Sequence, residues 1–170
     1  VLLYNGLVTK RNRVDEAVGQ IEVQLKRRHD LIPNLVAAVK DYMGFEQDVL
    51  TRVTEARANA VAAGAQGTVT QQQVQAENAL SGALRSLFAV VENYPDLKAN
   101  QNVLSLQEEL TATENKISFA RQFYNDSVLT YNNKIQMFPS NVIAGMFNFT
   151  ARQFFEAPEG DREVPKVDLR

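Results

Sequence analysis

A polar stripe on one predicted helix contains most of the residues in this sequence that could carry out chemistry. Its members follow one another at steps of four, three, four and seven, which places them on one helix face: Glu114, Ser118, Arg121, Asn125 and Asn132. In a helical bundle, charges and amides on such a face could bind a small ligand. We favour a structural network of buried hydrogen bonds and ion pairs that sets helix register. Its candidate members are Arg28, Asp30, Glu114, Arg121, Asn125 and Asn132.

His29 is the single histidine of the chain and offers a second kind of chemistry. An imidazole beside Arg27 and Arg28 could accept a phosphoryl group and have its charge screened. However, proline follows this histidine by four positions, whereas the phospho-acceptor box of sensor kinases has it at five, and no nucleotide-binding domain fits in the remaining residues. We favour an exposed histidine at the carboxyl end of a helix, where it interacts with the helix dipole.

Other catalytic sites lack their essential residues. A carboxylate-bridged di-metal bundle needs two Glu-x-x-His pairs, which one histidine cannot supply. Glu108 and Glu109 are adjacent, so their side chains point about 100° apart on a helix and form a solvated face. The sequence also has no nucleophile elbow and no glycine-rich phosphate loop after a strand. We therefore expect no catalytic residue, no metal, no cofactor and no enzymatic activity.

The composition is that of one globular domain. The chain has 170 residues, of which 45% are hydrophobic and 22% are charged, with a formal net charge of −2. This charge gives no preference for nucleic acid, and the absence of cysteine excludes disulfides and thiolate sites. No apolar run reaches the roughly 18 residues that a membrane-spanning helix requires.

Two seams of apolar residues at steps of three and four must position the polar groups. The first seam comprises Leu7, Val14, Val18, Ile21, Leu25 and Ile32. The second comprises Val103, Leu106, Leu110, Ile117, Ala120, Tyr124, Tyr131, Ile135 and Phe138. Each seam needs a partner surface to bury it, so the sequence predicts an all-α bundle.

Glycine, proline and capping residues divide the pattern into four long helices, at about 5–29, 31–63, 71–94 and 102–137. Asp30 is expected to cap the second, Thr70 the third, and Asn100 or Asn102 the fourth. The second helix should turn inward Ile32, Leu35, Val39, Tyr42, Met43, Val49, Val53 and Ala56, and the third Val74, Leu80, Leu84, Leu87, Val91 and Tyr94. The segment 64–69 is the main internal break, and Pro95 ends the third helix. Short connections favour an antiparallel up-down four-helix bundle.

A short aromatic segment follows the fourth helix. One or two helical turns are expected at 141–146, and four phenylalanines follow within nine residues: Phe147, Phe149, Phe154 and Phe155. We interpret them as a flap over one end of the core, with a partner-binding surface as the alternative. Residues 1–155 then form the bundle domain, and 156–170 form a charged, extended tail.

Several ordered motifs resemble the LemA family over essentially the whole chain. They are Tyr4-Asn5-Gly6-Leu7-Val8, the run Gln24 to Leu35, Tyr94-Pro95-Asp96-Leu97-Lys98-Ala99-Asn100, Ala120-Arg121-Gln122-Phe123-Tyr124-Asn125 and Phe138-Pro139-Ser140-Asn141. The resemblance implies a four-helix bundle in a bacterial cell membrane, anchored by one amino-terminal helix just upstream of Val1. It implies no catalytic activity.

The sequence thus predicts a membrane-tethered, single-pass helical scaffold or protein-interaction module. A protein partner or a second copy is expected, whereas nucleic acid and a small-molecule ligand are not. The alternative is a signalling or ligand-binding bundle that uses His29 or the stripe of Arg28 and Arg121. The membrane face that the domain occupies is left open, because charge bias compares both flanks of a span and one flank is missing.

Overall fold

The computed structural model describes residues 1–40, 47–64 and 69–157, and within these ranges it contains helices and no strand. The helices are α1 (Leu2–Lys40), α2 (Gln47–Ala63), α3 (Gln71–Val91), α4 (Pro95–Ala99), α5 (Gln101–Gln136) and α6 (Ser140–Met146). The predicted all-α class is therefore confirmed. Of the earlier expectations, the inward positions Tyr42 and Met43, most of the break at 64–69 and the tail beyond 157 lie outside the described residues.

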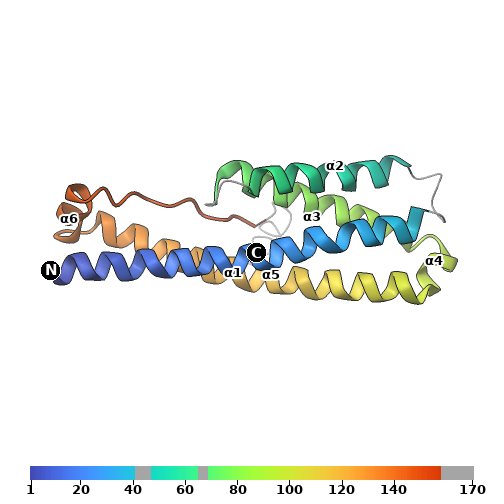
Figure 1. The fold of residues 1–170 in the computed structure, drawn as a ribbon, viewed down its shortest axis with the longest axis horizontal. Helices are drawn as coiled ribbons and strands as arrows, with labels where there is room; N and C mark the ends of the chain where they lie inside the picture. Colours follow the sequence, from blue (N-terminus) through green and yellow to red (C-terminus); the bar gives the residue numbers. More distant parts are fainter. Residues whose placement is uncertain (41–46, 65–68, 158–170) are drawn as a thin grey trace, which may run out of the picture.

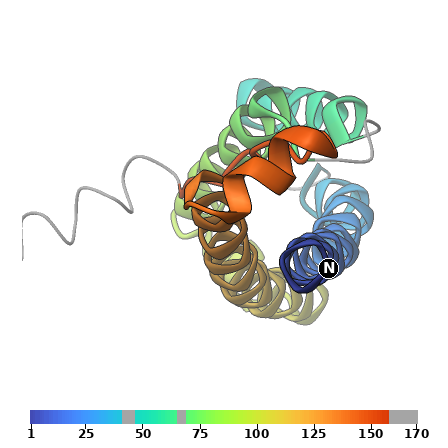
Figure 2. The ribbon, with the colours of Figure 1, turned by 90° about the vertical axis from the view of Figure 1, so that its left-hand side faces the viewer.

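The two longest helices, α1 and α5, lie side by side in opposite directions along the whole molecule (Figure 1). A hairpin of α2 and α3 covers only the half that contains the carboxyl end of α1. Over the other half, α6 and the extended residues 148–157, here called the strap, lie on the same side of the long pair (Figures 1 and 2). The molecule thus consists of a long helix pair with a different covering over each half, and the expected helices at 71–94 and 102–137 correspond to α3 and α5.

The first expected helix boundary is wrong, because α1 continues through Asp30 and Pro33 to Lys40. A proline inside a helix has no N–H for the carbonyl four residues earlier, which here belongs to His29. The structure supplies another donor, since Arg57 Nε of α2 donates to the His29 carbonyl at 2.7 Å. The proline is therefore tolerated because a side chain from a neighbouring helix replaces the missing donor.

The starts of α3 and α5 have the expected side-chain caps. Thr70 Oγ1 accepts from the Gln73 amide at 3.1 Å at the start of α3, and Asn100 Oδ1 accepts from two amides at the start of α5. Pro95 does more than end the preceding helix, since it is the first residue of α4. At the end of α6, Asn148 has a φ of 59° and the Phe149 amide donates to the Ala144 carbonyl, which is a Schellman motif.

The core consists of two apolar clusters, one in each half of the molecule. The strap half contains the first part of the α1 seam, the last part of the α5 seam, and Phe149 and Phe155 from the strap. The other half contains the inner faces of α2 and α3 with the remaining parts of α1 and α5. The two predicted seams are buried or partly buried apart from Phe138, which is 81% exposed.

Candidate functional site

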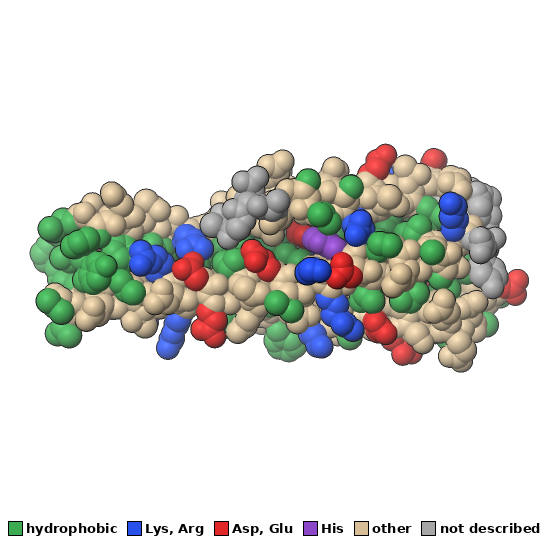
Figure 3. All heavy atoms as spheres, viewed as in Figure 1, with side chains coloured by type: hydrophobic (Ala, Val, Ile, Leu, Met, Phe, Trp, Pro, Cys, Tyr) green, Lys and Arg blue, Asp and Glu red, His purple; other side chains and the backbone are tan. Residues whose placement is uncertain are grey.

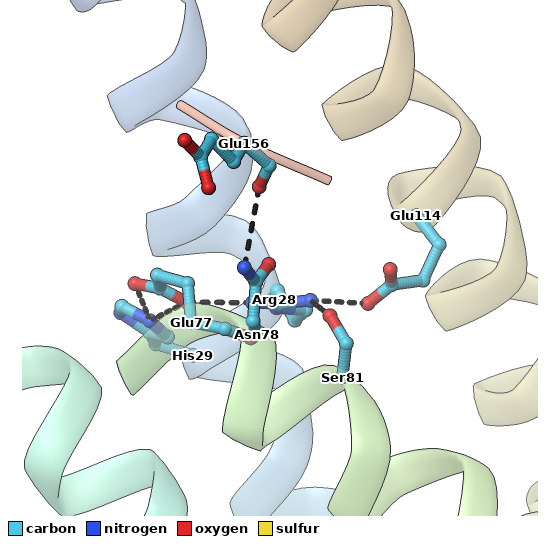
Figure 4. Close-up of polar contacts among 7 residues, drawn as sticks. All are labelled: Arg28, His29, Glu77, Asn78, Ser81, Glu114 and Glu156. Carbon is cyan, nitrogen blue, oxygen red and sulfur yellow. Dashed lines mark hydrogen bonds and ion pairs between the residues drawn. The ribbon is translucent and has the colours of Figure 1, made fainter. Parts of the chain in front are cut away.

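A layer of polar side chains separates the two apolar clusters, and we call it the polar layer. On α1, Arg28 lies between Leu25 of one cluster and Ile32 of the other. On α3, Glu77 lies in the same way between Val74 and Leu80. On α5, Glu114 lies between Leu110 and Ile117. Ser81 and His29 complete it (Figure 4). Each charge therefore occupies a level of the core at which an apolar residue would otherwise be expected.

Arg28 is the centre of the layer and is only 1% exposed. Its Nη1 donates to Glu114 Oε1 at 2.5 Å and to Ser81 Oγ at 2.7 Å. Its Nη2 donates to Glu77 Oε1 at 2.6 Å and to the Glu77 carbonyl at 3.1 Å. The guanidinium thus joins three helices at one level (Figure 4), and this geometry fixes their register.

His29 is not at a helix end, and the expectation of an exposed imidazole is wrong. The residue lies inside α1 with a side chain that is 12% exposed, and its Nε2 is 2.9 Å from Glu77 Oε2 and 3.2 Å from Oε1. An incoming phosphoryl group would meet the negative charge of this carboxylate. The ring is thus placed to hold Glu77 rather than to accept phosphate.

The polar layer leaves little capacity for a ligand. A small hollow of about 230 Å³ lies beside it, with His29 and Glu77 in its wall. The carboxylates of Glu77 and Glu114 both bind the Arg28 guanidinium, whose single positive charge balances one of them. Arg28 Nε is buried without a hydrogen-bond partner in the described structure. The arrangement can hold three helices together, and in the described ranges no group of three or more acidic, cysteine or histidine side chains could hold a metal ion.

Asn125 and Asn132, predicted to join the same network, instead bind the strap. Each side-chain amide forms a pair of hydrogen bonds with one backbone unit. Asn125 Nδ2 donates to the Phe155 carbonyl and its Oδ1 accepts from the Phe155 amide, both at 2.8 Å. Asn132 does the same with Arg152, at 3.2 and 2.9 Å. The polar stripe therefore divides into two sites with different partners.

A tyrosine precedes each of these asparagines and also binds the strap backbone. Tyr124 Oη donates to the Gln153 carbonyl, and Tyr131 Oη donates to the Thr150 carbonyl at 2.8 Å. Burial raises the pKa of Tyr124 from 10.0 to about 12, although the nearby Arg152 cation opposes the shift. Burial also raises the pKa of Tyr131. Both phenols therefore remain proton donors to the strap at neutral pH.

The spacing of the two Tyr-Asn pairs matches the strap. The pairs are seven residues apart on α5, a rise of about 10.5 Å. Their partners on the strap are three residues apart, and three extended residues span about 10 Å. One helix face can therefore bind a straight extended segment at two successive points.

The remaining predicted residues lie in separate places. Asp30 is exposed and pairs with Lys26 at 3.3 Å on the surface of α1. Arg121 is half-buried on α5, one turn before Asn125. Of the four clustered phenylalanines, Phe149 and Phe155 are buried in the core, Phe154 packs against it, and Phe147 is exposed.

Three residues that were not predicted from the sequence complete the surroundings of Arg28 and His29: Glu77, Ser81 and Arg57. A signal for Glu77 was present, because it stands three residues after Val74 and three before Leu80, within the apolar face of its helix. A buried charge at such a position requires an opposite charge on the apolar face of another helix. Arg28 occupies such a position on α1. No comparable signal marked Arg57, whose bond is to a backbone carbonyl.

Comparison with known proteins relates this architecture to one family. Residues 17–169 match the model of the LemA family. The chain belongs to the LemA family. The resemblance seen in the motifs is thereby confirmed over most of the length.

Proteins that are similar in sequence to this chain occur in different bacteria. Protein LemA of Metamycoplasma hominis is 27% identical over 167 residues, which cover 98% of this chain and 75% of that protein. Magnetosome protein MamQ 2 of Paramagnetospirillum magneticum is 26% identical over 187 residues, covering 96% of this chain and 69% of the relative. Magnetosome protein MamQ of Magnetospirillum gryphiswaldense is 25% identical with the same coverage. None of these names denotes a reaction.

Proposed function

We propose that this LemA-family chain is a membrane-associated helical scaffold or protein-interaction module that acts without catalysis. One observation carries the proposal: the charged groups of the interior are occupied by one another, whereas large apolar side chains lie on the surface. Arg28 and Glu77 are at most 2% exposed and form an ion pair with each other, while Phe119 on α5 is 73% exposed. Such a molecule is built to present surfaces rather than a reaction centre.

The membrane part of the proposal rests on the family and on its relatives. Kinship with LemA and with magnetosome proteins supports association with a bacterial membrane. We further propose that a single helix upstream of Val1 tethers the domain. In the part of the chain that the structure describes, no helix is both long and apolar enough to cross a bilayer.

We also propose that α1, α2, α3 and α5 form an antiparallel four-helix bundle over half of the length of the molecule, within a domain of residues 1–155. The polar layer supports this, because it fixes three of these helices at one level. A fixed register gives a rigid surface, and a rigid surface costs less conformational entropy when a partner binds. We propose a protein partner or a second copy of the chain.

Site-specific photo-crosslinking in cells that make the full-length protein tests the proposal. A photoreactive residue at Phe119 should yield a discrete adduct in the membrane fraction, either with another protein or at twice the mass of the chain. The same residue at Phe155, which is 1% exposed, is the matched control and should yield none. Recovery of the chain in the soluble fraction, with no adduct from Phe119 or other exposed positions, would refute the scaffold.

A phosphotransfer function is the alternative that the same cells can test. Phosphohistidine on the wild-type protein that disappears in His29→Ala would replace the scaffold proposal by a signalling one. We expect no such signal, because Glu77 lies against the imidazole.

A further inference from the structure

One end of the molecule exposes large apolar side chains from three segments at once. This apolar tip is formed by the start of α1, the turn after α5, and α6. Its exposed members are Tyr4, Met137, Phe138, Val142, Met146 and Phe147. Hydrophobic side chains gather visibly at this end, where the amino terminus lies (Figures 1 and 3). The tip thus groups side chains that are far apart in the sequence.

The tip is an ordered surface, because aromatic contacts on its inner side join α1 to the residues after α6. The Tyr4 ring packs edge-on against Phe147 at 4.9 Å and against Phe149 at 6.0 Å between centroids. The Arg11 guanidinium lies 4.8 Å from the centre of the Phe149 ring. Phe149 is buried beneath this layer, whereas Phe138 and Met146 project outward with exposures of 81% and 68%. The exposed side chains therefore rest on a packed base.

Basic residues outnumber acidic ones around the tip. Residues 1–14 and 127–155, which build this end, contain five basic residues and no Asp or Glu. We call these five residues the basic collar: Lys10, Arg11, Arg13, Lys134 and Arg152. The whole chain has 20 acidic and 18 basic residues, and all 20 acidic residues lie outside these two ranges. Two acidic residues lie at the border of the collar: Asp15 pairs with Arg152 at 3.0 Å, and Asp126 lines the same hollow as Lys10 and Arg13.

The distance from tip to collar fits the dimensions of a lipid surface. Lys10 follows Tyr4 by six residues of helix, a rise of about 9 Å. An interfacial apolar surface enters the boundary between headgroups and acyl chains by about 5–10 Å. If the tip enters to this depth, the collar lies at the level of the phosphates, where anionic headgroups attract lysine and arginine.

We propose that the apolar tip inserts into the interface of a membrane that contains anionic lipid, while the basic collar binds the headgroups. The inference rests on the proposed function in placing the chain at a membrane. It adds a direct lipid contact made by the folded domain itself, which sets the long axis of α1 and α5 steeply to the surface. The α2–α3 hairpin is then held at the opposite end, away from the lipid.

Vesicle flotation of this chain, residues 1–170, tests the contact. We expect binding to vesicles of phosphatidylglycerol and phosphatidylcholine, and at least tenfold weaker binding to phosphatidylcholine alone or in 0.5 M NaCl. The double variant Phe138→Ser, Met146→Ser should bind at least tenfold less. Its matched control is Val23→Ser, a similarly exposed apolar residue on the flank of α1, which should bind like the wild type. Circular dichroism should show the same helicity for all variants.

The contribution of the collar is tested separately. Lys10→Gln combined with Lys134→Gln should remove most of the preference for phosphatidylglycerol, whereas Lys116→Gln, an exposed residue outside the collar, should leave it unchanged. Absence of binding to any vesicle, or binding that the tip variant does not weaken, would refute the inference. If the tip variant instead abolishes a dimer seen by sedimentation, the tip is a self-association surface and the lipid contact is also refuted.

The two proposals fail in different ways. Loss of vesicle binding with a persistent crosslink at Phe119 would remove the lipid contact and leave the scaffold. Vesicle binding through the tip without any crosslinked partner would support the lipid contact and remove the scaffold.

Discussion

Replacement of Glu77 by glutamine should destabilise the protein strongly, although the side chain keeps its size. The change removes the negative charge that faces Arg28 Nη2 at 2.6 Å. Removing one partner of a buried ion pair costs about 3–5 kcal/mol, because the other charge stays buried without compensation. Here Arg28 keeps Glu114, which is 34% exposed, and Ser81. We therefore expect a loss near the lower limit, about 3 kcal/mol.

Thermal and urea unfolding followed by circular dichroism measure the loss. At roughly 2–4 °C per kcal/mol for a chain of this size, the melting temperature should fall by about 6–12 °C. The matched control is Asp30→Asn, which removes one partner of the pair with Lys26. That pair is 78% and 61% exposed, so the control should change stability by less than about 1 kcal/mol.

A double-mutant cycle tests whether the loss comes from the pair itself. Arg28→Met and Glu77→Leu should each destabilise the protein, and the combined variant should be more stable than either single one, since no unpaired charge remains between them. Glu114 then remains, but water reaches it. If the two single effects simply add, or if Glu77→Gln melts like the wild type, the polar layer does not stabilise the fold as we infer.

Three further outcomes are expected, each from one contact. Arg57→Ala should lower the free energy of unfolding in urea by about 1–3 kcal/mol, because it leaves the His29 carbonyl without a donor. The loss should be smaller in a Pro33→Ala background, where residue 33 supplies its own N–H to that carbonyl. An equal loss in both backgrounds would contradict this reasoning. Burial raises the pKa of Tyr124 from 10.0 to about 12, so the stability that its proton contributes is complete below pH 10 and is lost as pH rises through 12. Tyr124→Phe should therefore remove one step near pH 12 from an alkaline titration followed at 295 nm. Asn125→Ala should expose the strap to proteases well before the helices unfold, and strap cleavage at the wild-type rate would contradict its role.

The apolar seams were predictable from sequence because burial imposes its period on the residues. Leu110 and Ile117 are buried as expected. Phe138 follows the same period but is exposed, since α5 ends at Gln136 and the helical spacing no longer governs its direction. Periodicity thus identifies inward positions only as far as the helix extends.

The course of α1 could not be predicted, because the deciding contact is distant in sequence. Local rules place a boundary near Asp30 and Pro33, and those rules assume that the orphaned carbonyl finds no other donor. Arg57 supplies that donor from 28 residues away. A local pattern contains no information about such a contact.

The polar stripe was recognised as a set, but its division between two sites was hidden. Glu114 faces Arg28, whereas Asn125 and Asn132 face the strap. Helical spacing places all three residues on one side of α5 but does not indicate what lies opposite at each level. That depends on where the α2–α3 hairpin stops and the strap takes its place.

The match between helix and strap constrains how members of this fold can change in length. One extra residue in α5 between the Tyr124-Asn125 and Tyr131-Asn132 pairs would turn one pair by about 100° away from the strap. Seven extra residues would restore the face, but the strap would need three more to reach both pairs, and α1 would need seven to stay beside α5. Insertions and deletions in this half are therefore compatible with the fold only as coordinated sets. The two helices α1 and α5 and the strap must change in length together, by seven residues in each helix for every three in the strap.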